Sequence, residues 1–226
     1  MQARLLPCLF LCPNAAVLRA GEREGDKRAL YTAAGCDMLV AERNGKEEYT
    51  MEELKLSLKD GEWPFTYIDH NREIVRAIVL DGAGRYYFTR IDRGDDFGKL
   101  CTIETSGGGV EPGEDLHSAI RRELREELGA EAEVLCKIGV VEDDYNLIHR
   151  HNIQHYFLCR ATAFGEKSLT QEEVETLHLS TLCLTYEEAV AEYHRCATTQ
   201  LGRLLAAREL PVVHRAKELI ALLAAE

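Results

Sequence analysis

The sequence predicts an α/β protein in which helices cover both faces of a mixed central sheet, an α/β/α sandwich that ends in a C-terminal helix. Three observations support this prediction. Strand-like stretches alternate with helix-like ones through the middle of the chain, glycine-containing turns separate them, and one helix carries an apolar residue at every fourth position. The 226 residues are enough for one substantial domain with an appendage.

The N-terminal part differs in composition from the rest of the chain. Residues 1–37 contain a short apolar stretch broken by prolines, which we interpret as an appended or misassigned leader, with disorder as one option and a secretory signal as the weaker alternative. Residues 38–64 are charged, and Thr50-Met51-Glu52-Glu53 has the form of a helix capping box. The sequence therefore predicts a helical segment at 38–64, followed by the main domain at 65–226.

The first half of the main domain reads as strands. Residues 73–80 and 85–91 are rich in β-branched and aromatic residues, and the turn sequence Asp81-Gly82-Ala83-Gly84 joins them. A polar loop is expected at 92–99, and a short strand at 100–104 leads into three glycines.

Helices dominate the second half. Residues 115–128 repeat leucine or isoleucine every four positions and end at Gly129. Strands follow at 132–141 and 153–163, and then come helices at 186–196 and 211–225, where Pro211 suits the first helical position.

Composition and charge exclude several functional classes. The fractions of 46% hydrophobic and 29% charged residues exclude wholesale disorder. No run approaches the roughly 20 apolar residues that cross a bilayer. The formal net charge of −12 argues against binding a nucleic-acid backbone by bulk positive charge. We therefore expect no nucleic-acid partner and no membrane partner, and a homodimer stays open.

The cysteines indicate a reducing compartment. No C-x-x-C pair occurs, and several cysteines fall in apolar stretches, so we interpret them as reduced thiols of a cytoplasmic protein rather than as a disulfide framework. They are Cys8, Cys12, Cys36, Cys101, Cys136, Cys159, Cys183 and Cys196.

The glutamates of the helix at 115–128 are placed unusually. On a helical projection Glu123 and Glu127 overlap the edge of the apolar stripe, whereas the arginines lie on the far side. A solvated charged face would put the glutamates opposite the stripe. Partly buried carboxylates are costly unless they bind a cation, and oxygen ligands at Glu123, Glu126 and Glu127 suit a hard ion such as Mg²⁺. The pattern therefore favours a metal site.

The same segment carries a complete motif. From Gly108 to Ala130 the chain fills every position of the pattern G-x5-E-x7-R-E-U-x-E-E-x-G-U, where U is aliphatic. This is the Nudix box, and the protein resembles the Nudix hydrolases from about residue 65 to about residue 200. The resemblance implies a metal-dependent hydrolase that cleaves a phosphoanhydride bond of a nucleoside diphosphate linked to another group, by attack of water on phosphorus. The partner that it implies is a small-molecule nucleotide or diphosphate substrate.

The resemblance also implies residue roles. The metal ligands and catalytic carboxylates would be Glu123, Glu126 and Glu127, with Mg²⁺ as the ion and Mn²⁺ as the alternative. Arg122 would act in catalysis by orienting Glu123 through a charge-assisted hydrogen bond. Glu114 and Gly129 would be structural members of the box. The expected substrate-binding residues are Gly107, Gly108, Gly109, Arg90 and Glu104.

Several alternatives stay open. His149, His151 and His155 alternate along a predicted strand, which is a weaker candidate for a metal cluster. Tyr145, about fifteen residues past the box, weakly favours a dinucleoside polyphosphate over an ADP-ribose-type substrate. An isopentenyl-diphosphate isomerase-like enzyme would need a catalytic cysteine, for which Cys101 is the nearest candidate. A non-catalytic nucleotide-sensing module is the other alternative.

Overall fold

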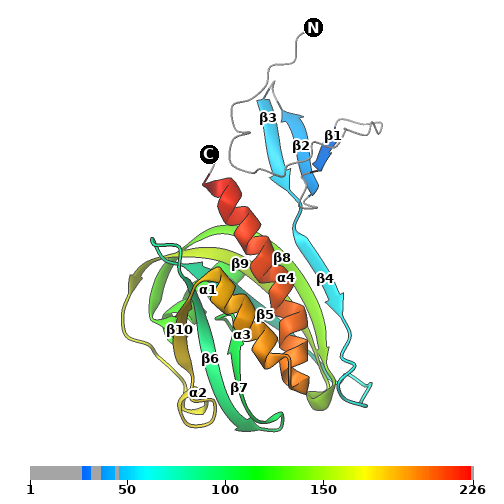
Figure 1. Cartoon of the computed structure of the whole chain (residues 1–226), viewed down its shortest axis with the longest axis vertical. Helices are drawn as coiled ribbons and strands as arrows, with labels where there is room; N and C mark the ends of the chain where they lie inside the picture. The colour runs from blue at the N-terminus through cyan, green and yellow to red at the C-terminus, as the bar shows by residue number, and fades with distance from the viewer. Residues whose placement is uncertain (1–26, 32–36, 44–45, 225–226) are drawn as a thin grey trace. The chain divides into compact units, whose positions relative to one another are not determined.

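The computed structural model of the chain describes residues 27–31, 37–43 and 46–224, with side chains from residue 52 onward (Figure 1). The chain divides into two compact units, at residues 1–52 and 53–226. The first contains an antiparallel sheet in the order β1 (Lys27–Tyr31), β2 (Asp37–Arg43) and β3 (Lys46–Met51). Most of the expected leader, at 1–26 and 32–36, lies outside the described residues.

The helical segment expected at 38–64 is wrong, because β2, β3 and β4 (Leu54–Leu58) are all strands. In β4 the three leucines are half-buried and the residues between them are exposed. That alternation has the period of a strand. The segment forms a strand despite the capping-box sequence, because it pairs in parallel with residues 139–143 of a long strand, β8.

The second unit is built on one mixed sheet in the order β10-β6-β5-β9-β8-β4, with β7 paired to β6. The β4–β8 and β5–β9 pairs are parallel and the others antiparallel. The strands are β5 (His70–Leu80), β6 (Tyr86–Asp95), β7 (Gly98–Glu104), β8 (Ala130–Tyr145), β9 (Arg150–Phe164) and β10 (Ser180–Leu184). The predicted mixed sheet is confirmed.

The polar loop expected at 92–99 is instead a hairpin. Strand pairing of β6 with β7 continues to Asp95 and Gly98, so only two residues form the turn. One of them, Phe97, packs edge-on against Trp63 and Tyr145. The apolar contacts of this single aromatic residue stabilise strand pairing in a segment that looks polar in sequence.

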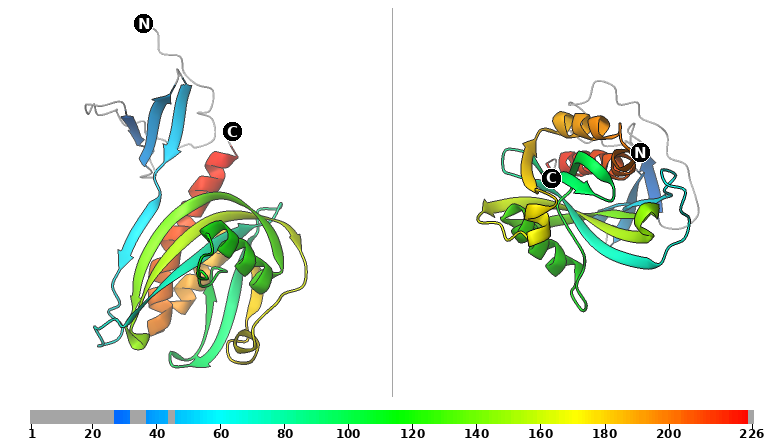
Figure 2. Two further views of the ribbon diagram at one scale, coloured as in Figure 1. Left: turned by 180° about the vertical axis from the view of Figure 1, so that it is seen from behind. Right: turned by 90° about the horizontal axis from the view of Figure 1, so that it is seen from below.

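Helices cover both faces of the large sheet, which confirms the predicted sandwich (Figure 2). On one side, α1 (Leu116–Leu128) packs its apolar stripe onto β5, β8 and β9 through residues such as Val75, Leu124 and Phe157. On the other side lie α3 (Tyr186–Cys196) and α4 (Gln200–Leu223), and a short helix α2 (Gln171–Glu175) precedes β10. Among the described helices, none is long and apolar enough to span a membrane.

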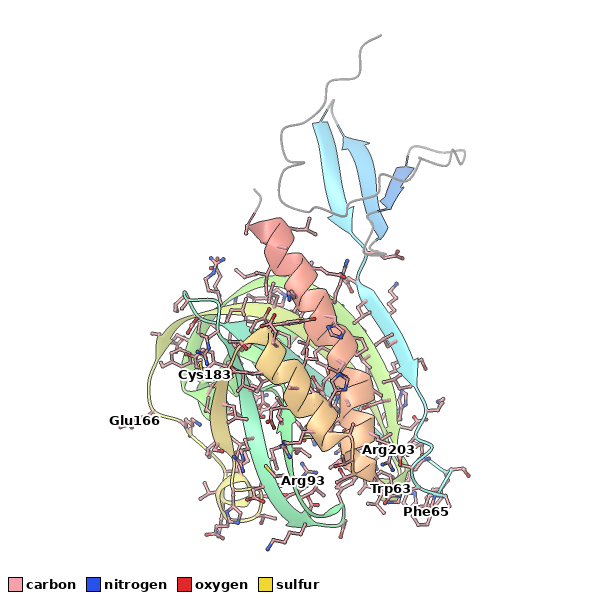
Figure 3. All side chains as sticks on the ribbon, viewed as in Figure 1. Trp63, Phe65, Arg93, Glu166, Cys183 and Arg203 are labelled. Carbon is pink, nitrogen blue, oxygen red and sulfur yellow. The ribbon has the colours of Figure 1, made fainter. Side chains whose placement is uncertain are left out.

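The C-terminal helix begins earlier than predicted. Pro211 lies inside α4 rather than at its first position, since the helix starts at Gln200 with Thr199 as its N-cap. Buried residues on both sides of the proline, among them Leu205 and Val213, hold the two halves against the sheet and compensate for the missing N–H. Near the start of α4, Arg203 forms an ion pair with Glu62, next to Trp63 (Figure 3).

Candidate active site

The glycine segment before α1 runs along the part of β5 that β6 leaves unpaired, because β6 pairs with β5 only at Val79 and Leu80. The Val75 N–H donates to the Gly108 carbonyl at 3.0 Å, and the Ala77 N–H donates to the Ser106 carbonyl at 2.9 Å. Gly107 has φ of 146°, and a side-chain carbon there would lie 2.0 Å from the Val75 carbonyl oxygen. Only glycine fits at this position, and the close approach fixes the loop against the sheet.

Caps at both ends define the helix that follows. The Asp115 carboxylate accepts hydrogen bonds from the backbone N–H groups of His117 and Ser118, each at 3.0 Å. At the other end Gly129 adopts a left-handed conformation with φ of 65°. From Ile120 to Leu128 the apolar stripe is buried, and its burial carries Glu123 and Glu127 below the surface, to 8% and 7% exposure.

Glu127 is held by the loop. Its Oε2 accepts hydrogen bonds from the Ser106 hydroxyl at 2.6 Å and from the Gly107 N–H at 2.9 Å. Burial raises the pKa of this carboxyl to about 7, although both hydrogen bonds act to lower it. Oε1 accepts no hydrogen bond from any described residue, so this oxygen remains available to a ligand.

Glu123 faces the next glycine. A side-chain carbon on Gly108 would lie 2.6 Å from both carboxylate oxygens of Glu123, so the glycine makes room for the carboxylate. Oε1 accepts a hydrogen bond from Arg122 at 2.7 Å, and Oε2 accepts none from the described residues. Burial raises the pKa of Glu123, and the Arg122 guanidinium only partly offsets this rise.

Arg122 connects the charged residues of the box. It donates to both carboxylate oxygens of Glu114, at 3.0 and 2.9 Å, and to the Gly109 carbonyl at 2.9 Å. It also donates to Glu123, and to Glu126 at 3.2 Å. The hydrogen bonds from Arg122 are the main reason that the pKa of Glu114 is lowered. One guanidinium thus joins the loop to the helix, and its contact with Glu123 agrees with the orienting role expected for it.

The carboxylates of α1 fit a hard divalent cation. Within residues 52–224, no three His, Cys, Asp or Glu side chains already converge on one point. Glu123 and Glu127 nevertheless lie one helical turn apart, both desolvated, and each keeps one oxygen without a protein donor. The side chain of Glu126 is 40% exposed beside them. Oxygen donors of this kind are what Mg²⁺ prefers.

Glu104, one of the expected substrate-binding residues, lies in a buried ion cluster that includes Arg208 of α4. It is buried among three guanidinium groups, at 3.3 Å from Arg76, 3.3 Å from Arg93 and 3.4 Å from Arg208. Burial alone would raise the pKa of Glu104, but the three cations outweigh burial and lower it. Glu104 was expected at the site because the residues after it lead into the glycines. The arginines Arg76 and Arg208, with which it forms ion pairs, lie far away in the sequence.

Arg90 lies on the side of the sheet away from α1. It shares a strand face with Tyr86 and Phe88, whose rings contact α3. Its Nε donates to the Cys101 thiol at 3.1 Å, and it lines a pocket of about 300 Å³ together with residues of β7, β10 and α3. The structure therefore does not bring Arg90 together with the box glutamates.

Sequence reasoning missed a buried polar cluster on α4. Arg208 and Glu209 are almost fully buried, at 1% and 0% exposure. Glu209 accepts hydrogen bonds from Thr105 at 3.0 Å and from Tyr156 at 3.1 Å, while Arg208 donates to the Tyr145 hydroxyl at 2.7 Å. Tyr145 is thus a structural residue here. The sequence signal that could have revealed this cluster is the charged pair Arg208 and Glu209 within an otherwise apolar helical stripe.

The three histidines do not form a cluster. His149 stacks on Tyr67, whereas His151 contacts Asp144 and His155 contacts Glu73. The cysteines of the described region are free, in agreement with the expected reduced thiols, although Cys183 is exposed. Cys8, Cys12 and Cys36 lie outside the described residues.

Comparisons with known proteins agree with the geometry of the box. A family model described as the NUDIX domain matches residues 70–200. The nucleoside triphosphatase NudI of Enterobacter sp. (strain 638) is 62% identical over 65 residues, which are 28% of this chain and 43% of that protein. The chain thus matches less than half the length of this curated relative.

Two solved structures are similar in part. The E. coli ORF135 protein is 24% identical, with coverage of 70% of this chain and 94% of that one and a TM-score of 0.46. The MutT protein of Methanosarcina mazei Go1 is 17% identical, with coverage of 68% and 97% and a TM-score of 0.48. Because the family model spans more than half of the chain and includes the whole glycine–helix segment, the chain belongs to the Nudix family.

Proposed function

We propose that this chain is a metal-dependent hydrolase that cleaves a phosphoanhydride bond of a nucleoside diphosphate linked to another group, by attack of water on phosphorus. The observation that carries the proposal is the burial and the hydrogen bonding of the Glu123 and Glu127 carboxylates. Both carboxylates are desolvated, both are fixed at one oxygen by the protein, and both keep the other oxygen without a donor. A buried carboxylate pair of this kind is costly unless a cation binds it.

Glu123, Glu126 and Glu127 would hold the ion, with Mg²⁺ expected and Mn²⁺ as the alternative. When bound, the cation would polarise a phosphoryl oxygen and lower the pKa of a coordinated water. Nudix enzymes generally use divalent ions, and the hard oxygen ligands of this site agree with that practice.

The chain's own residues position the reactants. Ser106 and the Gly107 N–H fix Oε2 of Glu127 and leave Oε1 free to bind the ion. Arg122 fixes Glu123 in the same way. The bare backbone at Gly107, Gly108 and Gly109 lets a phosphate approach the loop closely.

Nucleoside triphosphates are the first substrates to test, since the relative with the highly identical stretch is named a nucleoside triphosphatase. The two alternative functions have less support. The Cys101 thiol contacts Arg90 beside the pocket next to α3, so an isomerase that needs this cysteine near the metal is disfavoured. A nucleotide-sensing module would not need the intact set of box carboxylates.

The test is a product-release assay with Mg²⁺, with Mn²⁺ and with EDTA. The panel contains nucleoside triphosphates, ADP-ribose, dinucleoside polyphosphates and isopentenyl diphosphate. Metal-dependent release of a phosphorus-containing product from a nucleotide supports the proposal. Tight binding of nucleotides without turnover would support the sensor, and a shifted double bond would support the isomerase.

A further inference from the structure

Two arginines beside the glycine loop form no ion pair with any residue in the described part of the chain. They are Arg72 on β5 and Arg150 on β9. In the parallel pairing of these strands, His70 is opposite Arg150 and Arg72 is opposite Asn152. Paired residues of neighbouring strands, and residues two apart on one strand, point to the same face. The two guanidinium groups therefore extend from one face of the sheet, at the same end of the two strands.

Arg150 is only partly compensated by the protein. Its guanidinium lies 5.5 Å from the centre of the Tyr145 ring, a favourable cation–π contact, but its Nε is buried without a hydrogen-bond partner. Burial lowers the pKa of Arg150 and repulsion from Arg72 and Arg76 lowers it further, while attraction to Tyr145 and Asp143 offsets only part of the shift. Two neighbouring arginines that form no ion pair would be stabilised by a bound anion.

Arg72 links this pair to the active site. A side-chain carbon on Gly109 would lie 3.1 Å from Nη2 and 3.2 Å from Nε of Arg72, so the bare glycine makes room for the guanidinium. The preceding residue, Gly108, makes room for the Glu123 carboxylate in the same manner. The loop thus approaches a proposed metal ligand at one glycine and a cation without an ion pair at the next. Arg72 lies on the face of β5 opposite Val75, which packs under α1, so the loop separates the two groups.

A third polar group lies at the same place. Asn152, opposite Arg72 in the strand pairing, is 1% exposed and donates to Asp143. Its Oδ1 is buried and accepts no hydrogen bond from the described residues. Buried amide oxygens are normally satisfied, so an unpaired one beside two unpaired guanidinium groups is a mark of a ligand-binding position.

We propose that Arg72 and Arg150 form an anion subsite that binds a substrate phosphate beyond the one attacked at the metal. This proposal rests on the proposed function and narrows it. The preferred substrate carries a polyphosphate chain, as a nucleoside triphosphate does, rather than a diphosphate linked to a neutral sugar. Guanidinium groups suit this role because their fork of N–H donors matches phosphate oxygens.

The binding test needs no turnover. Inorganic tripolyphosphate is titrated in EDTA into the full chain and into the variants Arg72→Gln, Arg150→Gln and Arg160→Gln, with binding measured by calorimetry. Arg160 is the matched control, since it is an exposed arginine on the same strand, in an ion pair with Glu133. We expect affinity to fall about tenfold or more for Arg72→Gln and Arg150→Gln and to stay unchanged for Arg160→Gln. Equal affinity in all four proteins would overturn the proposal.

Stability and kinetics separate the proposal from a structural role. Removing a half-buried cation that forms no ion pair should leave the melting temperature of Arg150→Gln unchanged or raise it, whereas a structural arginine would lower it. Arg150→Lys keeps the charge and should retain part of the tripolyphosphate binding. With Mg²⁺, KM for a nucleoside triphosphate should rise about tenfold with kcat nearly constant, and KM for a nucleoside diphosphate linked to a neutral sugar should not change. If no nucleotide is hydrolysed but the arginine variants still lose tripolyphosphate binding, the proposed function fails and the anion subsite stands.

Discussion

The Ser106 hydroxyl donates a 2.6 Å hydrogen bond to Oε2 of Glu127 and so connects the glycine loop to the box helix. The preceding residue, Thr105, donates to Glu209 on α4 at 3.0 Å. Two neighbouring hydroxyl groups are therefore held by buried carboxylates on two different helices, on opposite sides of the sheet. Only one of these carboxylates belongs to the box.

This arrangement provides a matched pair of variants. Ser106→Ala and Thr105→Val each remove one donor from a buried carboxylate and should each destabilise the protein by about 1–3 kcal/mol. Only Ser106→Ala should also reduce Mg²⁺-dependent turnover, by roughly tenfold, because it frees the carboxylate that is proposed to hold the ion. Urea unfolding and initial rates check both variants. Equal turnover in the two would show that Ser106 does not position Glu127.

Glu127→Gln should separate chemistry from folding. The amide oxygen of glutamine can still accept from Ser106 and Gly107, and the relief of carboxylate repulsion should keep the melting temperature constant or raise it. Loss of the ion should lower turnover on the order of 10³-fold or more. Rates at saturating Mg²⁺ measure the effect, and near-normal turnover would falsify the metal-site assignment.

Leu124→Ala should act in the reverse direction. Leu124 is fully buried in the core between α1 and the sheet, so the truncation leaves a cavity and should cost about 2–5 kcal/mol of unfolding free energy. The folded fraction should keep its turnover, since Leu124 belongs to the apolar core and supplies no group to the proposed metal site. Denaturant titration with active-site-normalised rates tests this, and a loss of rate per folded molecule would contradict it.

Gly107→Ala should disturb the loop. The added carbon would clash with the Val75 carbonyl, and φ of 146° is strained for any side chain, so we expect a cost of at least ~1–3 kcal/mol together with lost turnover. Gly82→Ala is the control, since it lies in a turn with nothing within 4 Å of the new carbon. A melting temperature equal in the two variants would show that the backbone at Gly107 can relax.

The active-site helix could be predicted from sequence almost to the residue, because its signals are local. The apolar repeat ends at Leu128, Asp115 caps one end and Gly129 the other. The partial burial of Glu123 and Glu127 followed from the same repeat. Local periodicity also explains why the mixed sheet and both helical layers were expected correctly.

The features that sequence reasoning missed have a common physical cause, which is pairing between residues far apart in the sequence. The ion cluster around Glu104 has no local signature, because its partner Arg208 is 104 residues away. β4 was mistaken for part of a helix because its partner strand β8 lies beyond the box. Pro211 suggested the start of a helix. The helix continues through this proline because buried residues on both sides of it pack against the sheet, which no local pattern reveals.

The pairing of β4 with β8 affects how the chain can be shortened. The family match begins at residue 70, yet Leu54–Leu58 cover the edge of β8, where a side-chain carbon on Gly139 would lie only 2.0 Å from the Leu54 carbonyl oxygen. A chain that starts at residue 70 would present unpaired backbone N–H and C=O groups next to apolar side chains, which is a template for self-association. Light scattering should show residues 70–226 aggregating at concentrations where residues 53–226 do not. The boundary of the family is therefore not the boundary of the folding unit, and the solubility of the catalytic domain depends on five residues that the family pattern omits.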